Sequence, residues 1–442
     1  MKAREPRAEP PEEQGGGDRM FETGFVAPRA VLVRVVSQKP GPNLFVELEG
    51  LCETAGIEVV GDLVQVRPTP TPSHYLGRGK THELAALIGD RGADLVVVDE
   101  ELSPVQGRNL EKVLDVRVVD RSELILAIFE RNARTQQARM QVELARLQYE
   151  LPRLKRLWTH LHRERGGKGF LAGMGEKQIE VDRRLVRERI QKLKRRLDEI
   201  EDRKQREIGS RAREFMVSLV GYTNAGKSTL MNRLTEADLV AENRLFSTLD
   251  TRTRRWELGE GRFALLSDTV GFIRRIPHDL VASFHATLAE ALGADLLLIV
   301  VDVSDPEAFE QLETVRQVLD EIGAAGKESL VVLNKVDRLP DEERLFEFER
   351  RCPLAVPVSA VTGEGVESLR QAVVEAIDRF SGELWVAVPH DKAALQSALR
   401  RVASVVEARF TGERALFRVR IPPDALAALE AKGLERADVA PD

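Results

Sequence analysis

Short apolar runs alternate with amphipathic stretches over the first third of the chain. Apolar residues recur with helical spacing in two of these stretches, Thr81–Ile88 and Ser103–Val113. Four runs have the length and β-branched content of strands: Ala30–Val36, Val64–Arg67, Leu95–Asp99 and Val116–Asp120. This alternation predicts an α/β domain with a partly parallel sheet, which we place at residues 28–135. The loop Tyr75–Lys80 is interpreted as an ordinary turn in preference to a phosphate site, because two glycines and two basic residues carry little information.

The middle of the chain carries two apolar stripes with the 3,4 spacing of packed helices. A glycine-rich break, Arg165–Lys177, separates them and favours an antiparallel hairpin, which we place at residues 136–212. Each arm of about 25 residues would be roughly 40 Å long. Pro152 lies inside the first arm and predicts a kink or a boundary there. The stripes consist of Leu144, Leu147, Leu151, Leu154, Trp158 and Leu161, and of Val186, Ile190, Leu193, Leu197 and Ile200.

The second half of the chain returns to alternating strands and helices, and it predicts a mostly parallel sheet at residues 213–381. Its predicted helix is Thr229–Leu234, and its predicted strands are Glu214–Val220, Trp256–Leu258, Ala264–Asp268 and Leu330–Leu333. Residues 382–442 predict a smaller α/β domain, with strands Leu384–Val388 and Ala415–Ile421 around a helix Lys392–Val406. The fold class is therefore multidomain α/β.

Composition excludes several classes of protein. The content of 43% hydrophobic and 31% charged residues is that of a globular chain, and no apolar run of about 18 residues is present to span a membrane. Residues 1–27 are rich in Pro, Glu and Gly, which predicts a disordered tail and not a signal peptide. Cys52 and Cys352 are far apart, so neither a disulfide framework nor a zinc site is expected. We expect a cytoplasmic monomer.

Charge is unevenly distributed along the chain. Residues 131–213 contain 24 Lys and Arg against 12 Asp and Glu, a net charge of +12, whereas the whole chain carries −6. The rest of the chain therefore carries −18. Such a basic segment predicts contact with a polyanion such as nucleic acid, although a solvated helical surface with internal ion pairs explains the charge about equally well.

The predicted tip of the hairpin is both basic and apolar. Glycines let the backbone approach phosphates closely, and an exposed Phe170 can stack on an unpaired base. We favour RNA contact over the alternative, in which Phe170 and Leu171 fold back onto the hairpin. The tip cations are Arg163, Arg165, Lys168 and Lys177.

A phosphate-binding motif follows the strand Glu214–Val220. Residues 221–228 match G-x-x-x-x-G-K-[ST] between a strand and a helix. Glycines let successive backbone N–H groups surround the phosphates, and the helix N-terminus adds positive potential. Lys227 is expected to bridge the β- and γ-phosphates, and Ser228 to bind Mg²⁺.

Three further signals follow in the order that a guanine nucleotide site requires. Asp268 ends a strand beside the expected Mg²⁺, and the Gly271 N–H lies near the γ-phosphate. Asn334-Lys335-Val336-Asp337 ends another strand, and a carboxylate at Asp337 can accept from guanine N1–H and its 2-amino group, which adenine does not offer. Ser359 and Ala360 follow a last strand, where a backbone N–H can reach guanine O6. The ordered set predicts a site for GTP and GDP.

The set resembles the translation-factor-related P-loop GTPases. The resemblance implies that Phe246-Ser247-Thr248 belongs to the first switch, with Thr248 binding Mg²⁺ only beside a γ-phosphate. It implies catalytic roles for Lys227, Thr248 and Gly271, and Mg²⁺ ligation by Ser228, Thr248 and Asp268. The remaining expected nucleotide contacts are Gly221, Tyr222, Thr223, Asn224, Ala225, Gly226, Thr229, Phe246, Ser247, Thr269 and Val270.

Two positions of this site bear on the rate of hydrolysis. Phe272 stands where Ras-like proteins carry a water-orienting Gln, so we expect slow intrinsic hydrolysis. Asn224 is similar to the residue of GTPases that use a monovalent cation, which suggests stimulation by K⁺.

Beyond the nucleotide site, the chain resembles the HflX family of ribosome-associated GTPases over residues 28–380. The match is carried by Tyr75–Lys80, Asp99–Glu101, Gln106–Glu111, Gly173–Glu176 and Asp182–Arg184, with the motifs above. Lys177–Val181 departs from the Thr-Gln-Leu-Glu-Thr of many relatives. The resemblance implies binding to the large ribosomal subunit and its RNA through the 163–177 loop, near the peptidyl-transferase centre. It also implies splitting of stalled ribosomes under heat stress. Two alternatives are a GTP-regulated adaptor whose hairpin recruits protein helices, and an RNA-remodelling NTPase, which Asp337 disfavours.

Overall fold

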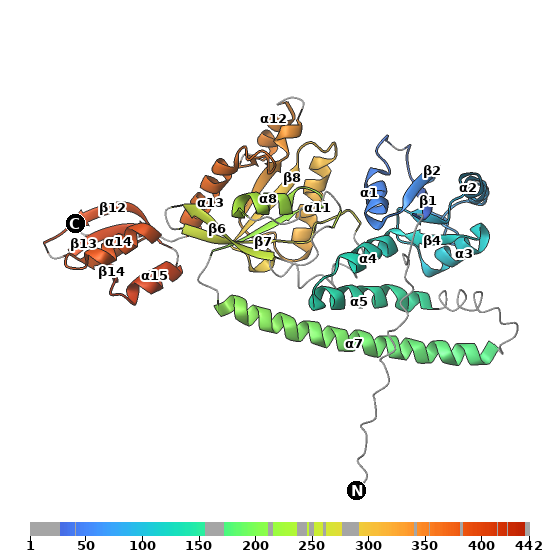
Figure 1. Ribbon diagram of the computed structural model, residues 1–442, viewed down its shortest axis with the longest axis horizontal. Coiled ribbons are helices and arrows are strands. Elements are labelled where there is room, and N and C mark those ends of the chain that lie inside the picture. Colours follow the sequence, from blue (N-terminus) through green and yellow to red (C-terminus); the bar gives the residue numbers. More distant parts are fainter. Residues whose placement is uncertain are drawn as a thin grey trace, which may run out of the picture.

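The computed structural model arranges the chain around three separate sheets (Figure 1). It describes residues 27–39, 41–154, 172–210, 215–236, 245–246, 252–259, 262–275, 291–339, 343–352, 354–380, 383–412, 414–421 and 423–437. The N-terminal sheet and the C-terminal sheet lie at opposite ends of the molecule, with the largest sheet between them. The multidomain α/β class predicted from the sequence is confirmed.

The N-terminal sheet is entirely parallel. Its strand order is β2-β1-β3-β4, and the two central strands are almost fully buried, as expected for parallel strands covered on both faces. The predicted β2 began at Val64, which was wrong by six residues, because this edge strand is only half buried and lacks a continuous apolar run. The strands are β1 (Arg29–Val36), β2 (Glu58–Val66), β3 (Leu95–Val98) and β4 (Arg117–Asp120).

Two pairs of helices cover the two faces of this sheet. Leu32 and Val97 pack against α1 (Val46–Ala55) and α4 (Arg121–Asn132), whereas Val33 and Val98 pack against α2 (Arg78–Arg91) and α3 (Pro104–Leu114). Helix α3 begins with a capping box from Ser103 and Gln106, and α4 begins with the carboxylate of Asp120 as its N-cap. Helix α2 begins at Arg78, so Arg78–Lys80 form its first turn and not a loop, which corrects the prediction.

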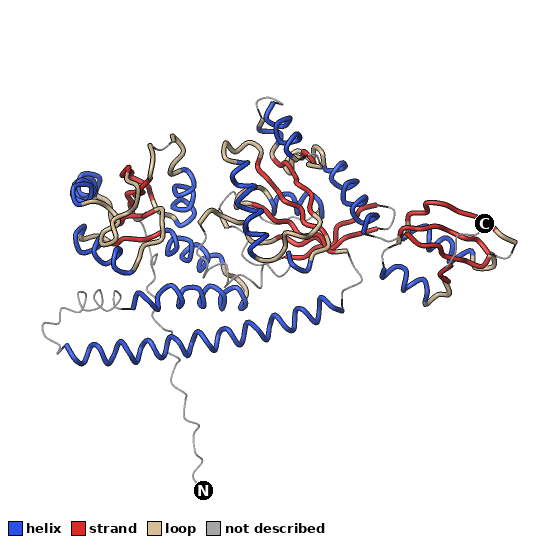
Figure 2. The backbone as a smooth tube through the Cα atoms, turned by 180° about the vertical axis from the view of Figure 1, so that it is seen from behind, coloured by secondary structure: helices blue, strands red, loops and turns tan. Residues whose placement is uncertain are grey.

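Two long helices form the predicted antiparallel hairpin (Figures 1 and 2). Helix α5 (Gln136–Glu150) ends in a 3₁₀ turn, η1 (Leu151–Arg153), so Pro152 marks a boundary as predicted. Helix α7 (Ala172–Ser210) includes the second half of the predicted glycine loop, because a helical glycine costs only about 1 kcal/mol. Residues 163–171 lie outside the described part of the chain. The arms are joined by buried Met140, Leu144, Leu193 and Leu197.

The central sheet has the order β10-β9-β8-β5-β7-β6, and all neighbours are parallel except β6 and β7. The strands predicted at Glu214–Val220, Ala264–Asp268 and Leu330–Leu333 are confirmed as β5, β7 and β9, with small shifts at their ends. Its strands are β5 (Met216–Gly221), β6 (Arg252–Gly259), β7 (Arg262–Asp268), β8 (Leu296–Asp302), β9 (Ser329–Asn334) and β10 (Val356–Pro357). Its described helices are α8 (Lys227–Thr235), α11 (Ala308–Glu321), η2 (Val336–Arg338), α12 (Glu343–Arg351) and α13 (Val366–Phe380).

The C-terminal sheet is antiparallel, with the order β12-β13-β11-β14. The predicted helix Lys392–Val406 was too long: α14 ends at Val402, Ala403 is extended, and the β-branched Val405 and Val406 belong to β12. The elements are β11 (Glu383–Pro389), α14 (Ala393–Val402), β12 (Ser404–Phe410), β13 (Arg414–Arg420), α15 (Pro423–Glu430) and β14 (Glu435–Ala437).

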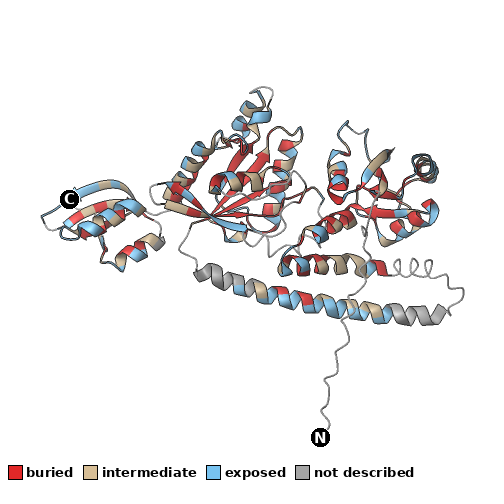
Figure 3. Ribbon diagram, in the orientation of Figure 1, coloured by how far each residue is buried: buried red, intermediate tan, exposed pale blue. Residues whose placement is uncertain are grey.

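Burial distinguishes the sheets from the hairpin (Figure 3). The N-terminal and central sheets share one continuous apolar core, which joins α1 and α4 to Tyr222, Phe246 and Phe272. Helix α7 is largely exposed along its described side chains. Within the described part of the chain, no helix is both long enough and apolar enough to cross a bilayer.

Candidate nucleotide site

The phosphate-binding motif forms the turn between β5 and α8, at the carboxyl end of the central sheet. Gly226 is the N-cap of α8 with a φ of 93°, a left-handed conformation that favours glycine. A Cβ atom at this position would also lie 2.3 Å from Asn334 Nδ2. Asn224 is left-handed as well, with a φ of 61°. The turn therefore presents the N-terminus of α8, which is the environment that binds phosphate anions.

Lys227 is held inside this turn. Its Nζ donates to the carbonyl of Tyr222 at 2.9 Å and to that of Gly221 at 3.2 Å. Burial lowers the pKa of Lys227 to about 8, against the opposing effect of the Asp268 carboxylate. Among the described side chains, none accepts a hydrogen bond from this ammonium group, so its charge is available to a phosphate.

A hydroxyl and a carboxylate meet next to Lys227. Ser228 Oγ donates to Asp268 Oδ2 at 2.6 Å, and Asp268, at the end of β7, is almost fully buried. Both are hard oxygen donors of the kind that Mg²⁺ prefers, so these residues fit the ion. The described residues contain no group of three His, Cys, Asp or Glu side chains that could hold a metal ion.

The second predicted half of the site joins β9 to the turn. Asn334 Nδ2 donates to the Ala225 carbonyl at 2.8 Å, and its Oδ1 accepts from the Ala360 N–H at 3.0 Å. Lys335 Nζ donates to the Asn224 carbonyl at 2.8 Å. The structure therefore brings the 221–228, 334–337 and 359–360 segments together. Asp337 lies in η2 with an exposed side chain.

The two backbone N–H groups predicted to contact the guanine base donate hydrogen bonds to other groups of the protein. The Ser359 N–H donates to the Glu364 carbonyl at 2.9 Å, and the Ala360 N–H donates to Asn334. Contact of either group with guanine O6 stays a prediction. The other predicted residues lie in the same elements: Thr229 in α8, Val336 in η2, and Thr269 and Val270 directly after β7.

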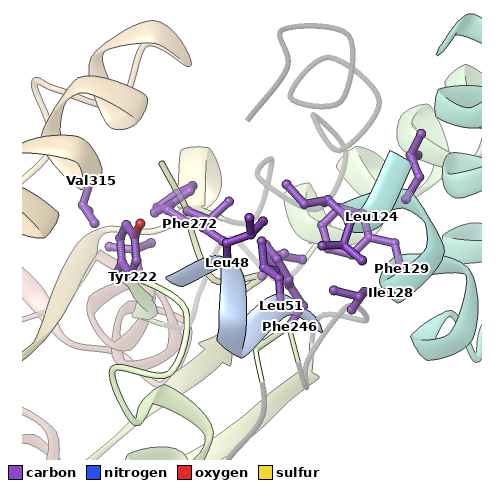
Figure 4. Close-up of a cluster of buried hydrophobic side chains, with 14 of the residues drawn as sticks. Leu48, Leu51, Leu124, Ile128, Phe129, Tyr222, Phe246, Phe272 and Val315 are labelled. Atoms are coloured by element: carbon purple, nitrogen blue, oxygen red, sulfur yellow. The ribbon is translucent and has the colours of Figure 1, made fainter. Parts of the chain in front are cut away.

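The predicted first switch is described only in part. Phe246 is buried and its ring meets that of Phe129 edge-on, at 4.6 Å between centroids (Figure 4). Its N–H donates to Thr223 Oγ1 at 2.9 Å, and its carbonyl accepts from Asn132 Nδ2 at 2.8 Å. Ser247 and Thr248 lie outside the described residues.

The Phe272 side chain lies in the core that the central and N-terminal sheets share. Its side chain is 3% exposed and lies with Tyr222 beside Leu48 of α1 (Figure 4). Its backbone pairs with the turn on both sides: the Phe272 N–H donates to Gly221 O at 3.0 Å, and its carbonyl accepts from Thr223 N at 2.6 Å. The ring is thus part of the shared core, and slow intrinsic hydrolysis stays a prediction.

Sequence reasoning missed several residues at the edge of the site. Asp302 pairs with Lys335 and follows the apolar run of β8, so the strand-end pattern that identified Asp268 could have found it. Glu47 and Arg121 reach the site from α1 and α4. Nothing local in the sequence marks them, because more than 150 residues separate each from the site residue that it contacts.

Comparisons with known proteins identify the relatives of this chain. Family models match residues 43–130 (GTP-binding GTPase N-terminal), 132–211 (GTP-binding GTPase Middle Region) and 216–335 (50S ribosome-binding GTPase). The chain is 45% identical to the GTPase HflX of Magnetococcus marinus, over 95% of this chain and 98% of that one. It is 44% identical to the GTPase HflX of Escherichia coli K12, over 87% and 91%. A GTP-binding protein from Sulfolobus solfataricus, solved in complex with GDP, is 28% identical, with a TM-score of 0.43, over 80% and 100%.

Proposed function

Because this chain belongs to the HflX family of GTPases and is therefore a GTP-hydrolysing enzyme, we propose that it uses GTP hydrolysis to control a basic arm on the large ribosomal subunit. The arm is the α5–α7 hairpin. In this proposal the GTP form places the arm in ribosomal RNA, splits or rescues a stalled ribosome under stress, and hydrolysis releases it.

The nucleotide site supplies the switch. We assign the β- and γ-phosphates to Lys227, the γ-phosphate also to the Gly271 N–H, and the guanine edge to Asp337. Ser228, Asp268 and Thr248 would hold Mg²⁺, which neutralises phosphate charge when it is bound. The arrangement that supports this is the single cluster of Lys227, the Ser228–Asp268 pair and Asn334 around one helix N-terminus.

Potassium stimulation is a separate part of the proposal. Asn224 is left-handed in the turn, and its carbonyl accepts from Lys335. Turnover in potassium buffer should exceed turnover in sodium buffer at equal ionic strength. Equal rates would discard this part and leave the rest intact.

The exposed length of α7 carries the RNA proposal. Its 39 residues span about 58 Å, and only one side packs on α5 (Figure 3). The ion pair Arg189–Glu143 at 2.7 Å also joins the two arms. Many other cations of α7 face solvent, where they can neutralise RNA phosphates: Arg184, Arg187, Lys192, Lys194, Arg195 and Arg196. Among the described stripe residues, the buried Leu144, Leu193 and Leu197 pack within the hairpin, so these three leucines do not support the adaptor alternative.

The test is GTP turnover and co-sedimentation with purified ribosomal subunits. The variant carries Arg187→Gln, Lys192→Gln and Arg195→Gln, and a second chain lacks residues 163–171. The control removes three exposed cations of the N-terminal domain with Arg91→Gln, Lys112→Gln and Arg117→Gln. We expect large-subunit stimulation that falls at least tenfold in the α7 variant, with a weaker salt dependence of binding, and not in the control. Equal losses in both triple variants, or no stimulation of the unmodified chain, would contradict the ribosome role.

A further inference from the structure

The C-terminal domain has the βαββαβ order of the ferredoxin-like fold. Its elements follow one another as β11-α14-β12-β13-α15-β14, and the first and third strands lie at the centre of the sheet. Apolar residues of the two helices, among them Leu399 and Leu429, pack on Val386 and Phe417 of these central strands. The helices therefore cover one face of the sheet (Figures 1 and 2).

The opposite face of this sheet carries an aromatic ring among arginines. Residues paired across two antiparallel strands share a face, and the register pairs Trp385 with Arg418 and Ala387 with Leu416. The same register places four arginines and three glutamates on this face. We call the whole set the open sheet face: Trp385, Ala387, Leu416, Arg409, Arg414, Arg418, Arg420, Glu383, Glu407 and Glu435.

Side-chain contacts confirm that the ring and the charges meet over the sheet. The Arg409 guanidinium lies above the Trp385 ring, with Cζ 5.4 Å from the ring centroid. Glu407 accepts from Arg409 Nε at 2.8 Å, and its other oxygen lies 3.9 Å from Arg418 Nε. Three neighbouring strands thus contribute to one surface of indole, guanidinium and carboxylate groups.

The Trp385 ring is not required for the core of the domain. The neighbouring side chains of β11, Val386 and Val388, are fully buried under the helices, whereas Trp385 is partly exposed and lies outside that core. An exposed aromatic ring can stack on any unpaired base, and arginines beside it can contact the phosphates. The bases of a double helix are stacked on one another and do not offer their faces to such a ring.

Charge favours a nucleic acid over a protein as the occupant of this face. The apolar side chains next to Trp385 are only Ala387 and Leu416 among the described members of the face, and Arg409, Arg414 and Arg420 are exposed around them. A ring surrounded by cations complements a polyanion with exposed bases. The Glu407 carboxylate can accept from a ribose 2′-hydroxyl, which DNA lacks.

We propose that the open sheet face binds single-stranded RNA, with Trp385 stacking on an unpaired base and Arg409 and Arg420 contacting phosphates. Glu407 orients Arg409 and takes part in the selection of RNA over DNA. This surface belongs to a different domain from the α5–α7 hairpin, and the proposal does not depend on the ribosome role.

The experiment titrates a fluorescein-labelled, unstructured RNA of about eight nucleotides with the full chain, in the background of the α7 triple variant described above, so that the hairpin contributes less. Trp385→Ala should weaken binding by about tenfold or more, because base stacking is lost. Trp385→Phe keeps an aromatic ring and should weaken binding by at most about threefold. DNA of the same sequence and duplex RNA should both bind more weakly than the single-stranded RNA.

A charge variant and its matched control test the phosphate contacts. Arg409→Gln with Arg420→Gln should weaken RNA binding by about tenfold and reduce its salt dependence. The control is Arg401→Gln with Lys432→Gln, which removes two exposed cations of the same domain from α14 and from the turn after α15. It should change the affinity by less than about twofold.

Intrinsic fluorescence gives a second readout of stacking at Trp385. A base stacked on the indole quenches its emission, so the RNA should quench part of the fluorescence of the unmodified chain. Trp385→Phe should abolish this quenching while it still binds RNA, and that binding shows that the variant is folded. Quenching that persists in Trp385→Phe would place the base on another residue and overturn the proposal, whether or not Trp385→Ala folds.

Three further results would also overturn the proposal. They are an unchanged RNA affinity of Trp385→Ala, equal losses in the Arg409–Arg420 variant and its control, and tighter binding of the DNA or of the duplex than of the single-stranded RNA. The ribosome role would be unaffected by any of them, because it is tested separately with ribosomal subunits and the α7 variant.

Discussion

The N-terminal and central sheets share a parallel topology but differ in how charges are matched at the carboxyl ends of their strands. In the N-terminal sheet, Asp99 is paired with Arg121 of its own domain, and Asp120 is paired with Arg153 of the hairpin. In the central sheet, Lys227 donates only to backbone carbonyls among the described groups. Ligands of parallel α/β sheets bind at this end of the strands. The central sheet keeps a cation for an anionic ligand, whereas the N-terminal sheet does not.

The strand order explains what occupies the same place in the N-terminal sheet. Its order β2-β1-β3-β4 reverses between β1 and β3, where a ligand crevice is expected. Asp99 follows β3 there, and its carbonyl accepts from Arg275 Nη1 at 3.4 Å. Arg275 also pairs with Glu100 at 3.7 Å. At the carboxyl ends of β1 and β3, where a ligand would be expected, Arg275 of the GTPase domain contacts the N-terminal domain instead. A carboxylate at the end of a strand does not by itself identify a binding site. Whether it can bind a ligand depends on whether cations of the protein already pair with it.

The largest expected effect concerns Lys227, whose ammonium group donates to no side chain among the described residues. Lys227→Ala should weaken GTP binding about 100- to 1000-fold, because charge-assisted hydrogen bonds to two phosphates are lost. The control is Lys327→Ala just before β9, at the amino ends of the strands, where Nζ also donates to a backbone carbonyl, that of Ala294, at 2.8 Å. Titration with a fluorescent GTP analogue measures both. A similar loss in the two variants would show that the fold and not the phosphate contact is responsible.

The second-largest effect concerns recognition of the guanine base by Asp337. Asp337 is exposed, whereas Asp99 of the N-terminal sheet is buried and paired with arginine. Asp337→Asn should lower GTP affinity about 100-fold and raise the affinity for xanthosine triphosphate, because an amide can donate to the base oxygen that replaces the 2-amino group. Competition between the two nucleotides for one labelled probe measures the exchange. Asp320→Asn, an exposed carboxylate of α11, is the matched control. Unchanged GTP binding by the Asp337 variant would remove guanine readout from this residue.

A third test concerns a carboxylate matched inside the N-terminal sheet. Asp120 is 2% exposed, and burial raises its pKa to about 6 even though Arg153 opposes the shift. The native state then keeps a proton that the unfolded chain loses near its ordinary value of 3.8, so stability falls as pH rises from about 4 to 6. Between pH 4.5 and 7 we expect a loss of about 2 kcal/mol at 1.36 kcal/mol per pKa unit.

Asp120→Asn should flatten this dependence, because an amide keeps the N-cap of α4 without titrating. Hydrogen exchange of residues 117–132, corrected for the intrinsic effect of pH, reports the local free energy of opening. Identical pH profiles for the variant and the unmodified chain would show that Asp120 is not the titrating group.

The sequence predicted the nucleotide-binding motifs more completely than it predicted the N-terminal helices that pack against them. The glycines, Lys227 and Asp268 are local patterns at strand ends, and such patterns survive folding. Helix α1 was missed because its acidic exposed face and its apolar contacts with the GTPase domain leave no clear amphipathic period of its own. The burial of Phe272 was missed for a related reason: the residues around it come from α1, more than 200 positions earlier. Strand order and the contacts of Glu47 and Arg121 with the GTPase domain depend on such distant pairs and have no local signature.

The smallest expected effect tests whether Lys227, as a neutral amine above pH 8, takes up a proton when GTP binds. Its pKa of about 8 lies below the ordinary 10.5, and bound phosphates should raise it again. Above pH 8, binding therefore has to take up a proton, and the affinity for GTP should fall by up to tenfold per pH unit between pH 8 and 9.5. Lys227→Arg keeps its charge over this range and should lack this part of the slope. Because titration of the nucleotide affects both proteins equally, the difference between their two pH profiles isolates the lysine. Parallel profiles would mean that Lys227 is already fully protonated before GTP arrives, and that burial in the turn does not depress its pKa.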